Sequence, residues 1–200
     1  MAKRCLPLDG DDDELALQAA GFAAIRKTEI LTPTELGFRA HMEAGRAEAA
    51  SERLLSRGSL LVTDDGRIDG IAGLTLRPTR HEMIIDGHST NTWCAFDSVG
   101  IPAALGVDAI ARTACGHCGS PIEVSFTAGA TRPSELWGWI PALDPNERAL
   151  IANFCSKADL FCSRDHLEAW WNDQGRPAGD PCPMEELLEM GRATWEHCVA

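Results

Sequence analysis

Residues 91–106 read NTWCAFDSVGIPAALG and carry the strongest signal in the chain. Inside a run of small and apolar residues, they place a thiol, Cys94, three positions before a carboxylate, Asp97. If the segment is helical, residues i and i+3 lie on one face and contact each other. A carboxylate raises the pKa of a neighbouring thiol, which makes that thiol a poor nucleophile. The pair better fits a sulfur that holds a soft metal beside an acid that moves a proton.

The composition describes an acidic chain, long enough for one domain with a small appendage. Its 200 residues include 18 Lys plus Arg and 30 Asp plus Glu, for a formal net charge of −12. This charge opposes binding to nucleic acid and to anionic membrane surfaces. There is no apolar run of the length that a transmembrane helix needs and no signal peptide. We therefore expect a cytoplasmic protein whose eight cysteines bind metal, catalyse or are buried, rather than form disulfides.

The N-terminal part shows helical periodicity followed by a hairpin pattern. Thr32 and Pro33 indicate a helix N-cap and first turn. The expected helices lie at 14–26, 32–42 and 45–55, and the expected strands lie at 59–63 and 67–76. This order predicts a winged-helix-like unit, so we divide the chain into a helical N-terminal part (1–76) and an α+β catalytic part (77–200). Arginines alternate with glutamates in the N-terminal part, which favours a structural role over DNA binding.

The catalytic part mixes both periodicities, which predicts an α+β fold. Expected strands lie at 82–88, 121–126 and 136–140. Expected helices run from Pro102 toward Ile110, over 163–171 with Ser163 as the cap, and over 184–197. Residues 175–183 are rich in Gly and Pro and predict a loop.

Two groups of cysteines have no assigned chemistry at this level. Cys5, Cys182 and Cys198 lie near the chain ends or in loops, and structural or incidental roles are expected for them. Cys115 and Cys118 form a Cys-x-x-Cys pattern followed by Gly, the shape of a zinc knuckle. A zinc site needs four ligands, and the nearest further candidates in sequence are His117, Cys155 and Cys162. Dithiol redox chemistry and a buried turn with inert thiols are the alternatives.

Cys94 and Cys155 form the third group, because each lies in an apolar, aromatic context. Small hydrophobic roles in the core would account for both of them. Asp97 changes this interpretation, since a carboxylate in such a run needs a partner or a function. Desolvation in an apolar pocket is expected to raise the pKa of Asp97.

Together, several motifs resemble the organomercurial (alkylmercury) lyase family in order and spacing. They are GRIDGIAGLTLRPT (66–79), WCAFDS (93–98), PAALG (102–106), His117-Cys118, NFC (153–155) and EAW (168–170). The combination is specific, although no single motif would be. The chain departs from the family pattern in its additional Cys115 and Cys162, in the sequence SKAD (156–159) and in its acidic, cysteine-containing C-terminal tail.

The resemblance implies an enzyme without a cofactor that cleaves carbon–mercury bonds by protonolysis. The family's two active-site cysteines and its aspartate fall on Cys94, Cys155 and Asp97, which would also hold the mercury of substrate and product. Cys118 matches a cysteine that is structural in the family. The implied fold joins a winged-helix-like part to an α+β part with antiparallel sheets. The implied substrate is a small organomercurial, and Hg(II) would pass to a mercuric reductase or to small thiols.

Mercury(II) is soft, so thiolates bind it in preference to oxygen and nitrogen ligands. We expect the two sulfurs of Cys94 and Cys155 and the carboxylate of Asp97 to converge in one apolar pocket, with Cys115 and Cys118 outside it. Two other functions stay open from the sequence. One is a non-catalytic thiol sensor or sequestering protein for metals, and the other is a zinc-stabilised domain built on Cys115 and Cys118.

Overall fold

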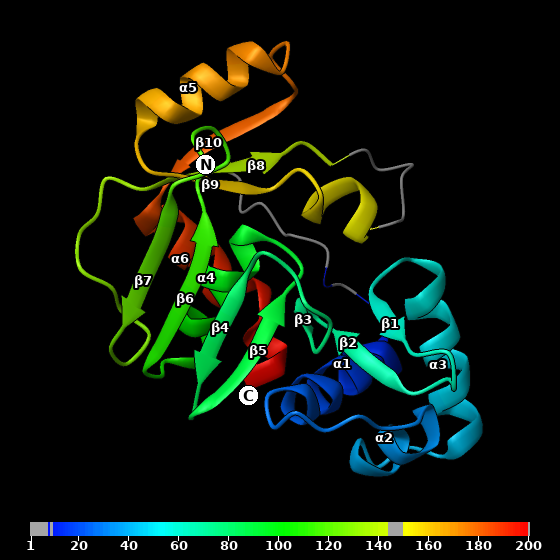
Figure 1. Cartoon of the computed structure of the whole chain (residues 1–200). Coiled ribbons are helices and arrows are strands. Elements are labelled where there is room, and N and C mark those ends of the chain that lie inside the picture. Colours follow the sequence, from blue (N-terminus) through cyan, green and yellow to red (C-terminus); the bar gives the residue numbers. More distant parts are fainter. Residues whose placement is uncertain (1–7, 9, 144–149, 200) are drawn as a thin grey trace.

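The computed structural model, which describes residues 8, 10–143 and 150–199, contains two antiparallel sheets flanked by helices (Figure 1). Cys5 lies outside the described residues. The expected α+β class with antiparallel sheets is confirmed. The helices are α1 (Asp12–Ile25), α2 (Pro33–Arg39), α3 (Ala44–Ser56), α4 (Ala95–Leu105), α5 (Arg164–Asp173), α6 (Met184–Thr194) and α7 (Glu196–Val199).

Helices α1 and α2 begin at side chains that satisfy free backbone N–H groups. Asp11 caps α1: its carboxylate accepts from the Glu14 backbone at 2.9 Å, and the Glu14 carboxylate accepts from the Asp11 backbone at 2.9 Å. Thr32 caps α2 ahead of Pro33, as the sequence predicts. Arg53 of α3 contacts Asp11 at 2.8 Å and Glu14 at 3.2 Å. Acidic groups of α1 therefore offset positive charge on α3.

The larger sheet has seven strands in the order β1-β2-β3-β5-β4-β6-β7. They are β1 (Leu60–Val62), β2 (Ile68–Ile71), β3 (Leu74–Thr75), β4 (Glu82–Ile85), β5 (His88–Thr92), β6 (Ala109–Ala114) and β7 (Pro121–Phe126). The expected strand over 67–76 is interrupted at Ala72 and Gly73, whose φ angles are +51° and +89°. After this turn, β3 pairs with β5. One sheet therefore crosses the predicted boundary at residue 76, and the winged-helix description stays a prediction.

The smaller sheet has the order β10-β8-β9, formed by β10 (Gly179–Pro183), β8 (Trp137–Pro141) and β9 (Asp159–Phe161). The prediction of a loop over 175–183 is wrong for its second half, which forms β10. Pro181 and Pro183 are tolerated there because β10 pairs only with β8 and lies at the edge of the sheet.

Helix α4, which lies within residues 91–106, is shorter than expected. It was predicted to run toward Ile110, but α4 ends at Leu105, and Gly106 follows in the left-handed conformation with φ +65° and ψ +30°. Glycine adopts this conformation without steric cost and commonly ends helices. The chain then enters β6 at Ala109.

Helices α4 and α6 lie together against one face of the larger sheet (Figure 1). Their backbones approach closely where Gly100 faces Gly191. A Cβ atom on Gly191 would lie 2.3 Å from Gly100 Cα and 2.7 Å from Gly100 O. Only a residue without a side chain fits at this crossing. Trp195 follows directly at the end of α6.

We expect Gly191→Ala to lower the free energy of unfolding by about 1–3 kcal/mol, because the clash is with backbone that has no freedom to rotate away. Gly45→Ala is the matched control. Gly45 is exposed near the start of α3 with nothing within 4 Å of its added Cβ, so this change should stabilise the protein by about 0.5 kcal/mol. Urea denaturation of both variants tests the difference, and equal stability would contradict the close crossing.

Within residues 8, 10–143 and 150–199, none of the helices combines the length and apolar character needed to cross a bilayer.

Candidate active site

Cys94 and Asp97 meet at the start of α4. Cys94 is the N-cap residue and lies just outside the helix, with extended backbone at φ −149°. Asp97, in the first turn, accepts a hydrogen bond at 3.0 Å from the backbone N–H of Cys94 to its Oδ2. The contact expected from their i, i+3 spacing therefore forms through the helix cap rather than along one helix face.

Cys155 ends a short π-helical segment, Ile151–Cys155. The backbone N–H of Ser156 donates to the carbonyl of Ile151 at 3.0 Å, the i to i+5 bond of a π-helix. Phe154 packs edge-on against Phe96 of α4, with ring centroids 6.2 Å apart and an interplanar angle of 82°. This aromatic contact holds the Cys155 segment against the start of α4.

The structure brings the three predicted site residues together. One ligand atom from each of Cys94, Asp97 and Cys155 lies within 4.8 Å of those of the other two. All three residues are buried, with exposed fractions of 0%, 5% and 6%. Such a group of two sulfurs and a carboxylate oxygen is suited to a soft metal next to a proton donor.

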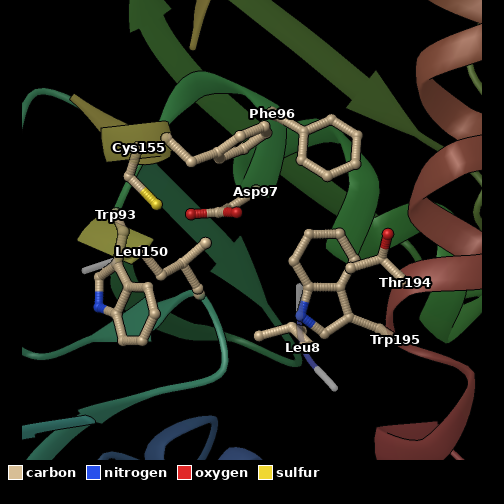
Figure 2. A pocket seen from close by; sticks show the side chains of 10 residues that line it. Leu8, Trp93, Phe96, Asp97, Leu150, Cys155, Thr194 and Trp195 are labelled. Carbon is tan, nitrogen blue, oxygen red and sulfur yellow. The ribbon is translucent and has the colours of Figure 1, made fainter. Parts of the chain in front are cut away.

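A small pocket reaches this group from the surface. Figure 2 shows the Cys155 sulfur and the Asp97 carboxylate facing each other between Trp93 and Leu150 on one side and Trp195 on the other. Its lining is otherwise apolar except for Thr194, and among the described residues that line it there is no Lys, Arg or His. The full lining is Leu8, Gly73, Trp93, Phe96, Asp97, Leu150, Phe154, Cys155, Thr194 and Trp195.

Burial is the largest influence on the pKa values of Asp97 and Cys94. It raises the pKa of Asp97 from 3.8 to about 7, although hydrogen bonds from Cys94 and from the Trp93 backbone act to lower it. Burial also raises the pKa of Cys94, assisted by its hydrogen bond to Cys155 and by the Asp97 charge. For Cys155, the hydrogen bond from Cys94 lowers the pKa, but burial and Asp97 raise it by more. Near neutral pH, Asp97 can therefore both hold and release a proton while the thiols stay protonated.

This shift predicts how stability depends on pH. Between pH 3.8 and about 7, the folded protein keeps the Asp97 proton that the unfolded chain loses. The free energy of unfolding therefore falls as pH rises through this range, by up to about 4 kcal/mol from this group. The asparagine of the Asp97→Asn variant does not titrate. We therefore expect the free energy of unfolding of Asp97→Asn, relative to that of the parent protein, to be higher at pH 8 than at pH 5. Urea denaturation at both pH values measures it, and a difference that does not change with pH contradicts the shift.

Several lining residues were not identified as site residues from the sequence, and two of them, Gly73 and Trp195, contact the residues around Asp97. Gly73 lies against Asp97: a Cβ on Gly73 would be 3.2 Å from Asp97 Cγ, so a larger residue would crowd the carboxylate. Trp195 donates from Nε1 to the carbonyl of Ala72 at 2.8 Å and stacks at 5.4 Å on Phe96. Gly73 belongs to a motif that supported the resemblance, whereas nothing local in the sequence marks Trp195.

The other cysteines lie apart from this group, as far as the structure describes them. Cys115 and Cys118 belong to a second cluster with Cys162 and His166. The sequence analysis considered Cys155 as a possible zinc ligand with Cys115 and Cys118. Cys155 lies instead with Cys94 and Asp97. Cys182 lies in β10 and Cys198 in α7.

A mixed fold that buries two thiols and an acid next to one another, beside an apolar pocket, defines a protein suited to binding and transforming a soft metal compound. The family model described as alkylmercury lyase matches residues 74–196, a range that contains Cys94, Asp97 and Cys155. The chain therefore belongs to the alkylmercury lyase family.

Individual relatives agree with this assignment. Alkylmercury lyase from Bacillus cereus is 29% identical over 149 residues, which are 72% of this chain and 66% of that protein. Those from Streptomyces lividans and Pseudomonas putida are 30% and 31% identical over 66% and 64% of this chain, and each is covered over 60% of its length. The chain thus spans somewhat less than two thirds of these relatives. The crystal structure of the mercury-bound form of MerB2 has the same fold, with a TM-score of 0.84 at 22% identity over 94% of this chain and 92% of that one.

Proposed function

We propose that this protein is an organomercurial lyase, which cleaves the carbon–mercury bond of a small organomercurial by protonolysis. The observation that carries the proposal is the convergence of Cys94, Asp97 and Cys155 in one buried group, two members of which, Asp97 and Cys155, line an apolar pocket. Membership of the alkylmercury lyase family supports it.

The first step is exchange of the substrate's mercury onto a thiol. Cys155 takes this role, because its sulfur faces the pocket in Figure 2, whereas Cys94 is fully buried and does not line the pocket. The Cys155 thiol exchanges with the ligand X of R–Hg–X, forming a sulfur–mercury bond and releasing HX. The carbon–mercury bond stays intact at this point, since one thiolate adds too little electron density to make the carbon basic.

The second step uses Cys94 and Asp97 together. The Asp97 carboxylate accepts the Cys94 proton, and the Cys94 thiolate becomes the second sulfur ligand of mercury. The added electron density makes the carbon basic, and the Asp97 acid returns the same proton to it. The carbon–mercury bond breaks, RH leaves, and Hg(II) remains on two sulfurs beside a carboxylate. A pKa of about 7 suits Asp97 to both directions of transfer.

The thiols and the acid supply every group that this sequence of steps uses, so we propose a reaction without a further cofactor. Two external thiols then exchange with the bound Hg(II) and restore the cysteines. Small cellular thiols or a mercuric reductase are the proposed acceptors, and the reducing cytoplasm is the proposed location. A non-catalytic metal sensor is not favoured, because pure binding does not need a carboxylic acid held beside the two sulfurs.

Headspace gas chromatography tests the proposal directly. Methylmercury or phenylmercury is incubated with the protein and excess thiol, and methane or benzene is measured. We expect hydrocarbon in proportion to protein concentration. Hydrocarbon no higher than in the protein-free control would contradict lyase activity.

A further inference from the structure

A second cluster of metal-ligand side chains lies outside the proposed active site. The ligand atoms of its four residues all lie within 4.8 Å of one another, and they belong to Cys115, Cys118, Cys162 and His166. The first two come from the turn between β6 and β7. Cys162 follows β9, and His166 lies in the first turn of α5, which Ser163 caps at 3.3 Å through the His166 N–H.

Two distances within the cluster match those of a tetrahedral zinc site. The Cys118 and Cys162 sulfurs are 3.8 Å apart, and the Cys115 sulfur is 3.7 Å from His166 Nδ1. Zinc–sulfur and zinc–nitrogen bonds of about 2.3 and 2.0 Å, at tetrahedral angles, place neighbouring ligand atoms about 3.5–3.8 Å apart. A disulfide would need about 2.05 Å between sulfurs, and the three cysteines are free.

The Cys118 sulfur has a hydrogen-bonding neighbour and is open to solvent. The Ser120 hydroxyl lies 3.2 Å from the Cys118 sulfur. Hydrogen bonds of this kind orient and stabilise sulfur ligands of zinc. Cys118 is exposed, so an ion can enter from solvent.

We propose that this cluster binds one Zn(II) through Cys115, Cys118, Cys162 and His166. Three thiolates and an imidazole fill all four positions, which is typical of a structural rather than a catalytic zinc. The cysteine pair predicted as a zinc knuckle thus finds its other two ligands in Cys162, one of the sequence candidates, and His166, which was not considered. The proposal goes beyond lyase activity and does not depend on it.

The site would fasten the smaller sheet to the larger one. Beside it, the Gly116 N–H donates to the Leu160 carbonyl of β9 at 2.9 Å, and Arg80 contacts Asp159 of β9 at 2.7 Å. β9 begins four residues after Cys155. A zinc ion at this point would therefore restrain the segment that carries Cys155 without touching the reacting atoms.

The test is metal analysis of the full-length protein, expressed without mercury, because mercury displaces zinc from thiolates. We expect about one zinc per chain in the parent protein and in Cys198→Ser, a cysteine outside both clusters. The double variant Cys94→Ser/Cys155→Ser should also keep its zinc. Cys118→Ser should lose most of its zinc. Cys118 is exposed, so this substitution should disturb folding least. Zinc-free parent protein, or zinc lost with Cys94 and Cys155 but kept in Cys118→Ser, overturns the proposal.

Cobalt substitution gives a readout that does not depend on any variant folding. Co(II) added to the metal-free parent protein should produce the visible bands of a tetrahedral ion and a sulfur-to-cobalt charge-transfer band. Adding Zn(II) should then remove both signals. Co(II) bands typical of six-coordinate oxygen ligation, or no bands, would show that the cluster is not the proposed site.

Discussion

Asp97→Asn is expected to slow hydrocarbon release by about 10²–10⁴-fold, the usual contribution of a positioned general acid. Asparagine keeps the size of the side chain and an oxygen that can accept the Cys94 backbone N–H, a bond of 3.0 Å in the parent protein. It has no proton to give to the carbon. Headspace gas chromatography measures the rate. Mass spectrometry of the protein after direct addition of Hg(II) measures binding of this ion, which should be retained.

Asp108→Asn provides the matched control. Asp108 also accepts a backbone N–H, that of Ala128 at 2.8 Å, but it is exposed and does not line the pocket. Its replacement should leave the rate of hydrocarbon release unchanged. If Asp97→Asn releases hydrocarbon at the parental rate, Asp97 is not the proton donor, even if lyase activity itself is present.

Cys155→Ser is expected to lower the rate of hydrocarbon release by about 10³-fold or more, equivalent to about 4 kcal/mol in the activation free energy. A serine hydroxyl is a hard and weak ligand for mercury, so only one sulfur remains. The carbon then lacks the electron density that it needs to accept a proton. The mass of the incubated Cys155→Ser protein should show bound mercury that still carries R, where the parent protein carries Hg(II) without R.

Cys198→Ser controls for the loss of a thiol as such. Cys198 lies in α7, and its sulfur is 3.2 Å from His197 Nε2 rather than in the pocket. Its replacement should preserve the parental rate. Parental activity in Cys155→Ser would rule out the two-sulfur mechanism, whereas inactivity in both variants would point to a general effect on folding, which circular dichroism would detect.

Local signals predicted much of the secondary structure correctly. The cap at Thr32 with Pro33 and the cap at Ser163 were both predicted, because each depends on hydrogen bonds within one turn. The strand β5 was missed because its sequence, HSTNT, lacks the apolar alternation of a half-buried strand. The edge strand β10 was missed because its prolines are typical of loops, and only pairing with β8 makes it a strand.

The sequence by itself determined the chemical composition of the site and one half of its geometry. Cys94 and Asp97 are three residues apart, and a helix N-terminus brings such positions together wherever the helix lies in the fold. The family resemblance added Cys155, but no local pattern placed it.

Only the tertiary structure decided how distant segments combine. In the folded chain, Cys155 lies next to Cys94 and Asp97, whereas Cys162 belongs to the other cluster. Gly73 and Trp195 line the pocket beside the first group. These contacts depend on strand order and on the packing of α4 with α6, which arise from burial across the whole molecule. Helical and strand periodicity report which face of a segment is buried, but not which distant segment covers it.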